Sequence, residues 1–540
     1  MPTKYIFVTG GVLSGLGKGI TVASIGRILQ ARGLRVAPIK CDAYVNIDAG
    51  TMNPVEHGEV FVTDDGIETD QDLGHYERFL NINLDRSNYT TTGQVYQSVI
   101  QRERNLEYDG ACVEVVPHVP EEIIRRIKEA GRRRRADVVI AEIGGTVGEY
   151  QNVLFMEAAR LMTSHHPRDV IHVHVGYLPI PPSIGEMKSK PVQYSIRSLN
   201  SVGIQPDFVV CRSREPIDER RKKKISLFGN IEFGNVIANP DVESIYELPL
   251  ILEKQKVAEK IMKRLGLKQV RPKMNEWQKL VSVIKSDKKP VEIGIVGKYF
   301  TTGDFHLEDS YVCVIEAIKH AAWANNLDPV IRWFDSENVM KHGVAQLEGL
   351  QGIIVPQGWG KRGTEGKLAT IQYAREQRIP YLGLCYGMQH AVIEFSRHVA
   401  GLADANSEEV DPRTSAPVIH IMENQKKLIA KKQYGGTIRL GSYPCQIKPG
   451  TLLAEIYGKR RVEERHRHRY EFNNAYKKRL EKNGLVISGT SPDGTLVEAV
   501  ELPDHPFFLG TQYHPEYKSR PLAPHPIFVK FIECAHKISR

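Results

Sequence analysis

Three residues in the C-terminal half of the chain have the types and order of an acyl-transfer triad. Cys385 is the centre of a G-x-C-x-G motif, Gly383–Gly387, that follows the apolar run Ile379–Leu382. Glycines two residues to either side permit a sharp strand-to-helix turn that exposes a nucleophile. His514 and Glu516 follow another apolar run and would act as the general base and the carboxylate that orients it. An isolated Cys or His is usually structural, but this combination favours catalysis.

A glycine-rich stretch near the N-terminus has the composition of a phosphate-binding loop. Gly10–Gly19 follows an apolar segment and opens an amphipathic one, so its N–H groups would meet an anion at a helix N-terminus, with Lys18 neutralising the outer phosphates. The strict G-x-x-x-x-G-K-[ST] pattern is not met, because Val12 and Gly19 occupy its first glycine and its hydroxyl position. Thr21 is a nearby hydroxyl. The alternative is a turn that needs glycines only for structure.

Two acidic residues are candidates for the Mg²⁺ that accompanies a nucleotide triphosphate. Glu142 ends the apolar run Val138–Ala141 and precedes two glycines, and Asp72 lies in the acidic stretch Glu68–Asp72. Mg²⁺ prefers hard oxygen ligands, and a carboxylate at the tip of a buried strand is well placed to supply one. The alternative is that these acids cap helices or face solvent.

Parallel strands must position these groups. The first half of the chain alternates short apolar runs with amphipathic stretches, which predicts βαβ units. The predicted strands are Tyr5–Thr9, Arg35–Lys40, Asp137–Ile143, Val170–Val175 and Phe208–Cys211, and the predicted helices are Gly19–Arg32 and Glu121–Arg132. Residues 42–74 are rich in Gly, Asp, Thr and Asn, which predicts a long functional loop or lid.

A polar stretch marks a domain boundary. We predict an N-terminal domain over 1–267, a linker over 268–290 with a helix at Glu276–Ile284, and a C-terminal domain over 291–540. The second domain has predicted strands at Val291–Gly297, Gly352–Val355, Pro380–Leu384 and Phe507–Gln512. The predicted fold class is α/β, with a P-loop-like parallel-sheet domain followed by a second α/β domain.

Composition limits the classes of function. The chain has 540 residues, of which 41% are hydrophobic and 25% charged, which is typical of globular proteins and excludes a fibre or a coiled coil. No apolar run is long enough to span a membrane, and the seven cysteines are scattered without a C-x-x-C pair, so we expect a cytoplasmic location. The net charge of +9 suits polyanionic ligands but does not distinguish nucleotides from nucleic acid.

With both motif sets on one chain, the sequence resembles the CTP synthase family, which joins a synthetase domain to a class I glutamine amidotransferase domain. The resemblance covers nearly the whole chain. It is carried by Tyr5–Val12, Asn53–Thr63, Asp72–Phe79, Glu142–Gly148, Gly203–Asp207 and Glu464–Glu471.

The resemblance implies ATP-dependent amination of UTP to CTP, in which UTP, ATP and glutamine give CTP, ADP, phosphate and glutamate. UTP would be phosphorylated on O4 before ammonia attacks C4. It also implies Mg²⁺ with ATP, GTP as activator, CTP as feedback inhibitor and a homotetramer, with no nucleic-acid or membrane partner.

Family motifs assign roles to residues of the N-terminal domain. The ATP site would comprise Gly15, Leu16, Gly17, Lys18, Gly19, Ile20, Lys40 and Asp72. Asp72 and Glu142 would bind Mg²⁺. The UTP and CTP site would comprise Ser14, Glu149, Tyr150, Gln151, Lys188, Ser189, Lys190, Pro191, Val192, Gln193 and Lys224.

The motifs also assign roles around the glutaminase. Cys385, His514 and Glu516 would form the catalytic triad, and the ammonia passage would be lined by Pro54, His57 and Val60. The glutamine pocket would comprise Gly358, Tyr386, Gly387, Met388, Gln389, Glu409 and Arg469. The arginines of Arg465–Arg469, which would otherwise indicate a nucleic-acid patch, would belong to this domain.

The chain departs from the family pattern at Val192 and Tyr194 of the UTP segment, at Ala43 and Ala49, and at two sites that bear on catalysis and regulation. Gln357 stands where a glycine usually precedes Gly358, and a positive φ there would cost about 1 kcal/mol or more. Glu149–Gln151 replaces an Asp-Ile-Glu sequence beside the pyrimidine, while Glu157 and Arg160 match residues linked to CTP feedback. We therefore predict altered inhibition by CTP.

Three other functions compete with this interpretation. Another glutamine-dependent amidotransferase with a phosphate loop would lack the UTP segment. A non-catalytic or glutaminase-impaired scaffold would have lost triad or metal residues, which this chain keeps. A nucleic-acid-binding protein would bind with a steep dependence on salt. Trp323, Trp333 and Trp359 lack a base-stacking pattern and are predicted to pack inside the domains.

Overall fold

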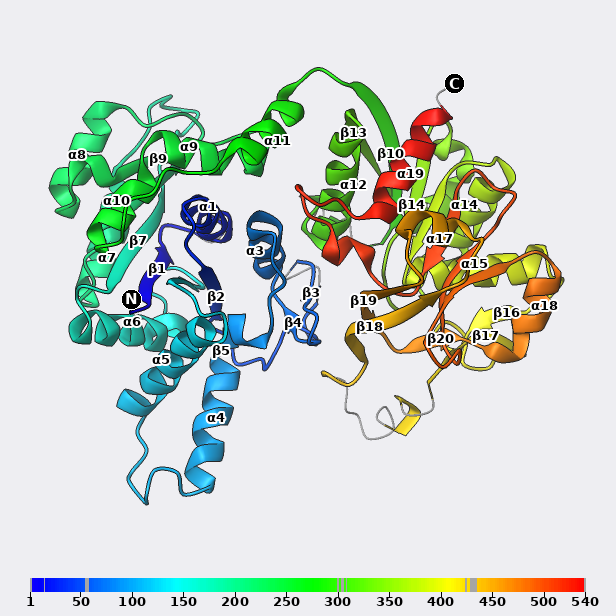
Figure 1. The fold of residues 1–540 in the computed structure, drawn as a ribbon, viewed down its shortest axis with the longest axis horizontal. Coiled ribbons are helices and arrows are strands. Elements are labelled where there is room, and N and C mark those ends of the chain that lie inside the picture. The colour runs from blue at the N-terminus through cyan, green and yellow to red at the C-terminus, as the bar shows by residue number, and fades with distance from the viewer. Residues whose placement is uncertain are drawn as a thin grey trace. The chain divides into compact units, whose positions relative to one another are not determined.

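The chain divides into two compact units in a computed structural model, drawn in Figure 1. The structure describes residues 2–13, 15–53, 58–298, 301–302, 305–306, 308–422, 425–427 and 435–538. The first unit comprises Met1–Asp48 and Asp72–Ile284, and the second comprises Ala49–Gln71 and Lys285–Arg540. Residues 49–71 thus pack with the C-terminal unit, although they lie within the N-terminal part of the sequence.

The first unit is built on a seven-stranded sheet in which every pairing is parallel. In sheet order its strands are β5 (Tyr89–Thr91), β2 (Val36–Asp42), β6 (Val138–Ile143), β1 (Lys4–Gly10), β7 (Val170–Tyr177), β8 (Phe208–Ser213) and β9 (Val236–Pro240). Strands β1, β2 and β6 are apolar and almost wholly buried, as expected for parallel strands covered on both faces. Their carboxyl ends therefore meet at one edge of the sheet.

Besides this sheet, the first unit contains helices, several of which pack against it. They are α1 (Lys18–Gln30), α3 (Asp72–Leu80), α4 (Thr92–Arg104), α5 (Val115–Arg133), α6 (Val153–His165), α7 (Lys190–Ser201), α8 (Glu219–Gly229), α9 (Leu248–Lys254), α10 (Val257–Arg264) and α11 (Asn275–Lys285). Phe7, Ile39 and Val139 form a core with Ile123 of α5 and Phe155 of α6. Helices α4 and α5 form an antiparallel pair that extends away from the sheet (Figure 1).

The second unit has a nine-stranded mixed sheet. In sheet order the strands are β13 (Leu327–Asp335), β10 (Lys289–Gly297), β14 (Gly352–Val355), β15 (Tyr381–Leu384), β23 (Phe508–Thr511), β22 (Val497–Glu501), β21 (Val486–Thr490), β18 (Arg439–Ile447) and β19 (Arg461–His468). Pairs from β13 to β23 are parallel, and pairs from β23 to β19 are antiparallel. A smaller sheet holds β16 (Ala405–Ser407), β17 (Ala416–Ile421) and β20 (Tyr470–Phe472).

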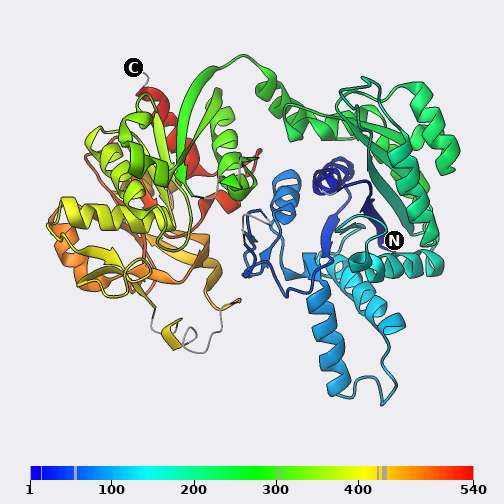
Figure 2. The same cartoon turned by 180° about the vertical axis from the view of Figure 1, so that it is seen from behind.

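Helices lie on both faces of the parallel half of this sheet, as the rear view shows (Figure 2). The described helices of this unit are α12 (Val312–Ala324), α13 (Ser336–His342), α14 (Thr364–Glu376), α15 (Tyr386–His398), α17 (Leu452–Tyr457), α18 (Lys477–Lys482) and α19 (Pro526–Lys537). Ile293 and Ile295 of β10 pack with α12 and α19, whereas Val296 and Ile353 pack with α13 and α14. No helix in the described ranges is both long and apolar enough to cross a membrane.

The predicted strands are present, and their ends differ from the prediction by at most two residues. The helix predicted to begin at Glu121 begins earlier, at Val115. The segment predicted as a long loop contains a short hairpin of β3 (Phe61–Val62) and β4 (Glu68–Thr69) and ends where α3 begins at Asp72. The parallel edge strands β5, β9 and β13 and the antiparallel half of the second sheet were not predicted.

Candidate active sites

Cys385 occupies a strained turn between β15 and α15. Its φ and ψ are 52° and −96°, a combination that non-glycine residues adopt rarely and that often accompanies a nucleophile. Both flanking glycines are needed because neither position has room for a side chain. A Cβ added to Gly387 would lie 2.0 Å from the Val355 carbonyl oxygen, and one added to Gly383 would lie 2.7 Å from the Tyr381 hydroxyl. The predicted elbow is therefore present, with the cysteine at the start of a helix.

His514 and Glu516 form a buried hydrogen-bonded pair. Nδ1 of His514 lies 2.7 Å from Oε1 of Glu516, and the ring of Tyr517 stacks on the imidazole at 4.8 Å. Burial disfavours the charged ring, but the negative charges of Glu516 and Cys385 outweigh it and raise the pKa of His514 to about 10. His514 therefore carries a proton in the resting site at neutral pH.

Two groups that sequence analysis did not identify contact the thiol. The Gln512 side-chain amide donates to Sγ of Cys385 at 3.6 Å, and the thiol lies 3.8 Å from the carbonyl oxygen of Arg467. Gln512 had been predicted only as the last residue of a strand, and Arg467 only as part of an arginine-rich run. The sequence feature that could have identified Gln512 is its position directly after β23 and two residues before His514.

A cavity beside Cys385 brings together most of the residues assigned to glutamine. Its lining comprises Gln357, Gly358, Trp359, Cys385, Tyr386, Gln389, Glu409, Arg467, His468, Arg469, Tyr470 and His514. Trp359, which was predicted only to pack, lines it. Gly387 and Met388 do not line it, because Gly387 packs against β14 and Met388 is fully buried against Gly510.

Two buried side-chain oxygens of residues that line this cavity lack a hydrogen-bond partner. They are Oε1 of Gln357 and Oε1 of Gln389. Buried polar atoms are normally paired, so a concentration of unpaired ones indicates where a polar ligand binds. The amide of a glutamine side chain has the donors and acceptor that such atoms require.

The loop after β14 is held in place by charged groups. Glu409, whose pKa is raised by burial, accepts from the Gly360 N–H at 2.6 Å, and Lys298 donates to the carbonyl oxygens of Trp359 and Gly360. Gln357 is not among the non-glycine residues with positive φ. The expected backbone cost of a glutamine at this position is therefore absent.

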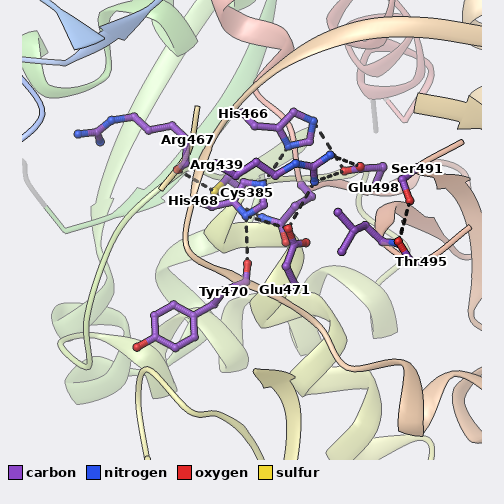
Figure 3. A network of polar contacts seen from close by, with 12 residues as sticks. Cys385, Arg439, His466, Arg467, His468, Tyr470, Glu471, Ser491, Thr495 and Glu498 are labelled. Atoms are coloured by element: carbon purple, nitrogen blue, oxygen red, sulfur yellow. Dashed lines mark hydrogen bonds and ion pairs between the residues drawn. The ribbon is translucent and has the colours of Figure 1, made fainter. Parts of the chain in front are cut away.

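A buried network of polar contacts adjoins the cavity at His468, and Figure 3 shows this network. Arg439 donates to both carboxylate oxygens of Glu498 at 2.6 and 3.2 Å and to Glu471 at 3.4 Å. Nδ1 of His468 lies 3.1 Å from the Tyr470 carbonyl oxygen and therefore carries a hydrogen, so Nε2 of His468 accepts from Nδ1 of His466 at 2.9 Å. Burial keeps the pKa of both rings well below the ordinary value.

Glu471 makes the second unit less stable as the pH rises. Burial raises its pKa from 4.5 to about 8 despite the Arg439 guanidinium. The folded chain thus retains a proton that the unfolded chain releases above about pH 4.5, so the free energy of unfolding falls between about pH 5 and pH 8. Replacing Glu471 by Gln should reduce the fall in the free energy of unfolding between these pH values by about 3 kcal/mol. Thermal unfolding at pH 5.5 and pH 8 measures this fall, and Glu481→Gln on α18 is an exposed control. An equal fall in the Glu471 and Glu481 variants would contradict the expectation.

The glycine-rich loop links β1 to α1, as predicted. Gly15 and Gly17 have φ of 72° and 76°, and Val12 has a φ of 86° where the strict motif has its first glycine. An added Cβ at Gly19 would lie 1.9 Å from Oδ1 of Asp72, which explains why the hydroxyl of the strict motif is absent. The hydroxyl of Thr21 donates to the Gly17 carbonyl oxygen, and Lys18 donates to the Gly145 carbonyl oxygen at 3.0 Å.

Lys40 sits among three carboxylates at the same edge of the sheet. Its ammonium forms ion pairs with Asp72, with Glu142 at 2.9 Å and with Asp42 at 3.7 Å. Burial raises the pKa of Glu142 and of Asp42, whereas at Asp72 the effect of burial is outweighed mainly by the charge of Lys40, which lowers the pKa. The hydroxyl of Tyr76 donates to Glu142.

These carboxylates fit a magnesium site. They are hard oxygen donors that converge on a position already occupied by a cationic group. In the part of the chain that is described, no cluster of three or more His, Cys, Asp and Glu is arranged to hold a metal ion by itself. Mg²⁺ commonly uses one or two carboxylates and takes its other ligands from phosphates and water, so Asp72 and Glu142 meet the requirement.

The residues assigned to UTP lie on separate elements of the first unit. Tyr150 is 95% exposed next to Glu149 and Gln151, and Lys224 lies on α8. Lys188 and Ser189 precede α7, and Lys190–Gln193 form its first turn; the Gln193 amide donates to the Ser189 hydroxyl at 2.9 Å, and Val192 is buried against Gly176. Among the described residues, no hydrogen bond or ion pair joins one of these three segments, Glu149–Gln151, Lys188–Gln193 and Lys224, to another.

Three residues assigned from the resemblance lie outside the described residues. They are Ser14 of the UTP site and Pro54 and His57 of the ammonia passage. Val60, the remaining passage residue, is buried in the second unit, and its carbonyl oxygen accepts from the Tyr517 hydroxyl at 3.1 Å. Because Tyr517 stacks on His514, Val60 lies close to the candidate catalytic site.

The arginine-rich run of β19 is not a nucleic-acid surface. Arg465 is fully buried and pairs with Asp64 at 2.6 Å, and Arg467 pairs with Glu68 at 2.8 Å. Their charges are thus neutralised inside the second unit.

A cysteine elbow with a buried His–Glu pair on a mixed α/β sheet defines a class I glutamine amidotransferase, here on one chain with a parallel-sheet unit that has a glycine-rich loop. Comparison with known families agrees: "CTP synthase N-terminus" matches residues 4–267 and "Glutamine amidotransferase class-I" matches residues 306–534. The chain belongs to the CTP synthase family.

Full-length relatives support this assignment. CTP synthase from Caldanaerobacter subterraneus subsp. tengcongensis is 52% identical over 98% of this chain and 98% of its own length. CTP synthase from Carboxydothermus hydrogenoformans is 51% identical over 100% of this chain and 99% of its own. Separately from this assignment, the chain is similar over 46% of its length to the solved glutaminase domain of Trypanosoma brucei CTPS, with 40% identity, 94% of that chain covered and a TM-score of 0.42.

Proposed function

We propose that the chain aminates UTP to CTP with ammonia from glutamine, in a reaction that converts ATP to ADP and phosphate. The observation that carries the proposal is the presence on one chain of two sites with complementary chemistry. One is the strained cysteine with a protonated His514, and the other is the glycine loop beside Lys18 and the Lys40 carboxylate cluster. Family membership over the full length supports it.

In the glutaminase, Cys385 attacks the side-chain carbonyl of glutamine as a thiolate. The N–H at the start of α15 faces the oxyanion, and His514 gives its proton to the departing amide nitrogen, so ammonia leaves and a thioester remains. Water then attacks the thioester while His514 takes its proton, which releases glutamate and restores the thiolate. Glu516 holds the imidazole through Nδ1 and stabilises its charge.

In the synthetase, Lys18 and Lys40 place positive charge beside the phosphate that moves from ATP to O4 of UTP. Mg²⁺ held by Asp72 and Glu142 would neutralise phosphate charge when bound. Phosphorylation makes O4 a good leaving group, so ammonia adds at C4 and phosphate departs. The remaining ATP and UTP assignments, and those of Gly358, Tyr386, Gln389, Glu409 and Arg469 to glutamine, belong to this proposal.

Regulation and assembly are proposed on the resemblance. They comprise GTP activation, CTP feedback that is altered at Glu149–Gln151, a homotetramer and a cytoplasmic location. The last is consistent with all seven cysteines being free thiols.

Parallel assays with two nitrogen donors test the function. CTP formation from UTP, ATP and Mg²⁺ at pH 8 is expected with glutamine and also with ammonium chloride. Formation with ammonium chloride alone would indicate an intact synthetase with a failed glutaminase or ammonia passage. No product with either donor, in folded protein that binds nucleotide, would favour a scaffold role.

A further inference from the structure

We propose that Gln357 is a positioning residue that ties the loop lining the glutamine cavity to the segment Gly58–Thr69, so that glutamine hydrolysis depends on this tie. The inference deepens the proposed glutaminase activity and rests on it. In the resemblance described above this position is usually a glycine, which has no side chain to make the contact. The contact is therefore not part of the usual family pattern.

The contact is a charge-assisted hydrogen bond inside the second unit. Nε2 of Gln357 donates to Oε1 of Glu59 at 2.7 Å, and Oε2 of Glu59 accepts from the backbone N–H of Cys313 at 2.6 Å. Glu59 is 4% exposed, so both bonds are shielded from water. One carboxylate thus joins the cavity loop to the first turn of α12.

The geometry fixes the orientation of the Gln357 amide. Because Nε2 faces Glu59, the carbonyl oxygen Oε1 faces away from it, and Oε1 is buried with no hydrogen-bond partner. Gln357 and the adjacent Gly358 both line the cavity that contains Cys385 and His514. A shift of Gln357 therefore changes the wall of the cavity next to the reacting groups.

The same segment contacts the site at three other places. The Val60 carbonyl oxygen binds Tyr517, which stacks on His514; Asp64 pairs with Arg465; and Glu68 pairs with Arg467, whose carbonyl oxygen lies near Sγ of Cys385. Gln357 adds a contact on the loop after β14. Hydrogen bonds and ion pairs at several points therefore connect the segment to the glutaminase site.

The bond can be broken and rebuilt with its donor and acceptor exchanged. Gln357→Glu places a second carboxylate against Glu59, which should lower kcat of glutamine hydrolysis about tenfold or more. Combining it with Glu59→Gln restores the bond, because the new amide at position 59 donates to the new carboxylate at position 357 and still accepts from the Cys313 N–H. We expect the double variant to recover to within about threefold of the original rate.

The rate of glutamate release measures the effect of the Gln357–Glu59 bond on glutamine hydrolysis. CTP formation from ammonium chloride in the same preparation shows whether the synthetase is intact. An unchanged kcat in Gln357→Glu, or a double variant as slow as the single one, would overturn the proposal. Gln357→Ala, which removes the bond without adding charge, should be slow as well, and a normal rate would also overturn it. If the original protein releases glutamate but makes no CTP from either donor, the proposed function fails while the test of Gln357 stands.

Discussion

Replacing Cys385 by alanine abolishes CTP formation from glutamine and leaves formation from ammonium chloride intact. The expected loss of glutamine-dependent activity is at least about 10⁴-fold, because a triad without its nucleophile retains only binding and oxyanion stabilisation. The alanine keeps the fold, since Cys385 contributes a small side chain at a turn whose shape is set by the close packing of Gly383 and Gly387. Initial rates with each donor measure the two outcomes separately.

Cys534→Ala on α19 is the matched control, because this cysteine lies outside the lining of the candidate glutamine cavity and should leave both activities unchanged. Residual glutamine-dependent synthesis above about one-tenth in the Cys385 variant would assign the nucleophile elsewhere. Loss of the ammonium-dependent reaction would show that the glutaminase elbow is needed for the synthetase, which contradicts two separable sites.

The inner parallel strands were predictable because each is buried on both faces and so forms a nearly continuous apolar run, whereas the parallel edge strands β5, β9 and β13 were not predicted. Strand β19 was not predictable from the sequence, because its arginines and histidines have the pattern of a charged surface. Arg465 and Arg467 are buried only because Asp64 and Glu68, about four hundred residues earlier in the chain, supply their counter-charges. Pairing over such a separation leaves no local signal in a sequence.

Within the candidate site, too, residues in local motifs were predictable and residues that depend on long-range contacts were not. Cys385, His514 and Glu516 belong to short motifs whose spacing predicts their chemistry. Gln512 and Tyr517 act through a contact with a thiol and a stacked ring, and these contacts exist only after the strands are aligned. For Gln357, the sequence indicated a possible backbone cost, whereas the backbone conformation and the bond to Glu59 required coordinates.

Replacing Lys40 by methionine should abolish CTP formation with either nitrogen donor and also destabilise the first unit. Lys40 is the cation at the centre of Asp42, Asp72 and Glu142, and its side chain is 6% exposed. Methionine keeps the length and apolar stem but removes the charge. Removing one partner of a buried ion pair costs about 3–5 kcal/mol, because the remaining charges lose their compensation.

Two measurements separate the catalytic effect from the structural one. Thermal unfolding reports the loss of stability, and CTP formation from ammonium chloride, measured well below the midpoint, reports the loss of a cation beside the transferring phosphate. Arg35→Met is the control: its ion pair with Asp137 is exposed, so it should cost less than about 1 kcal/mol and leave the rate unchanged. A Lys40 variant that melts like this control, or that retains ammonium-dependent synthesis, would show that the cluster does not depend on Lys40. In that case Glu142 would hold its position through the hydrogen bond from Tyr76.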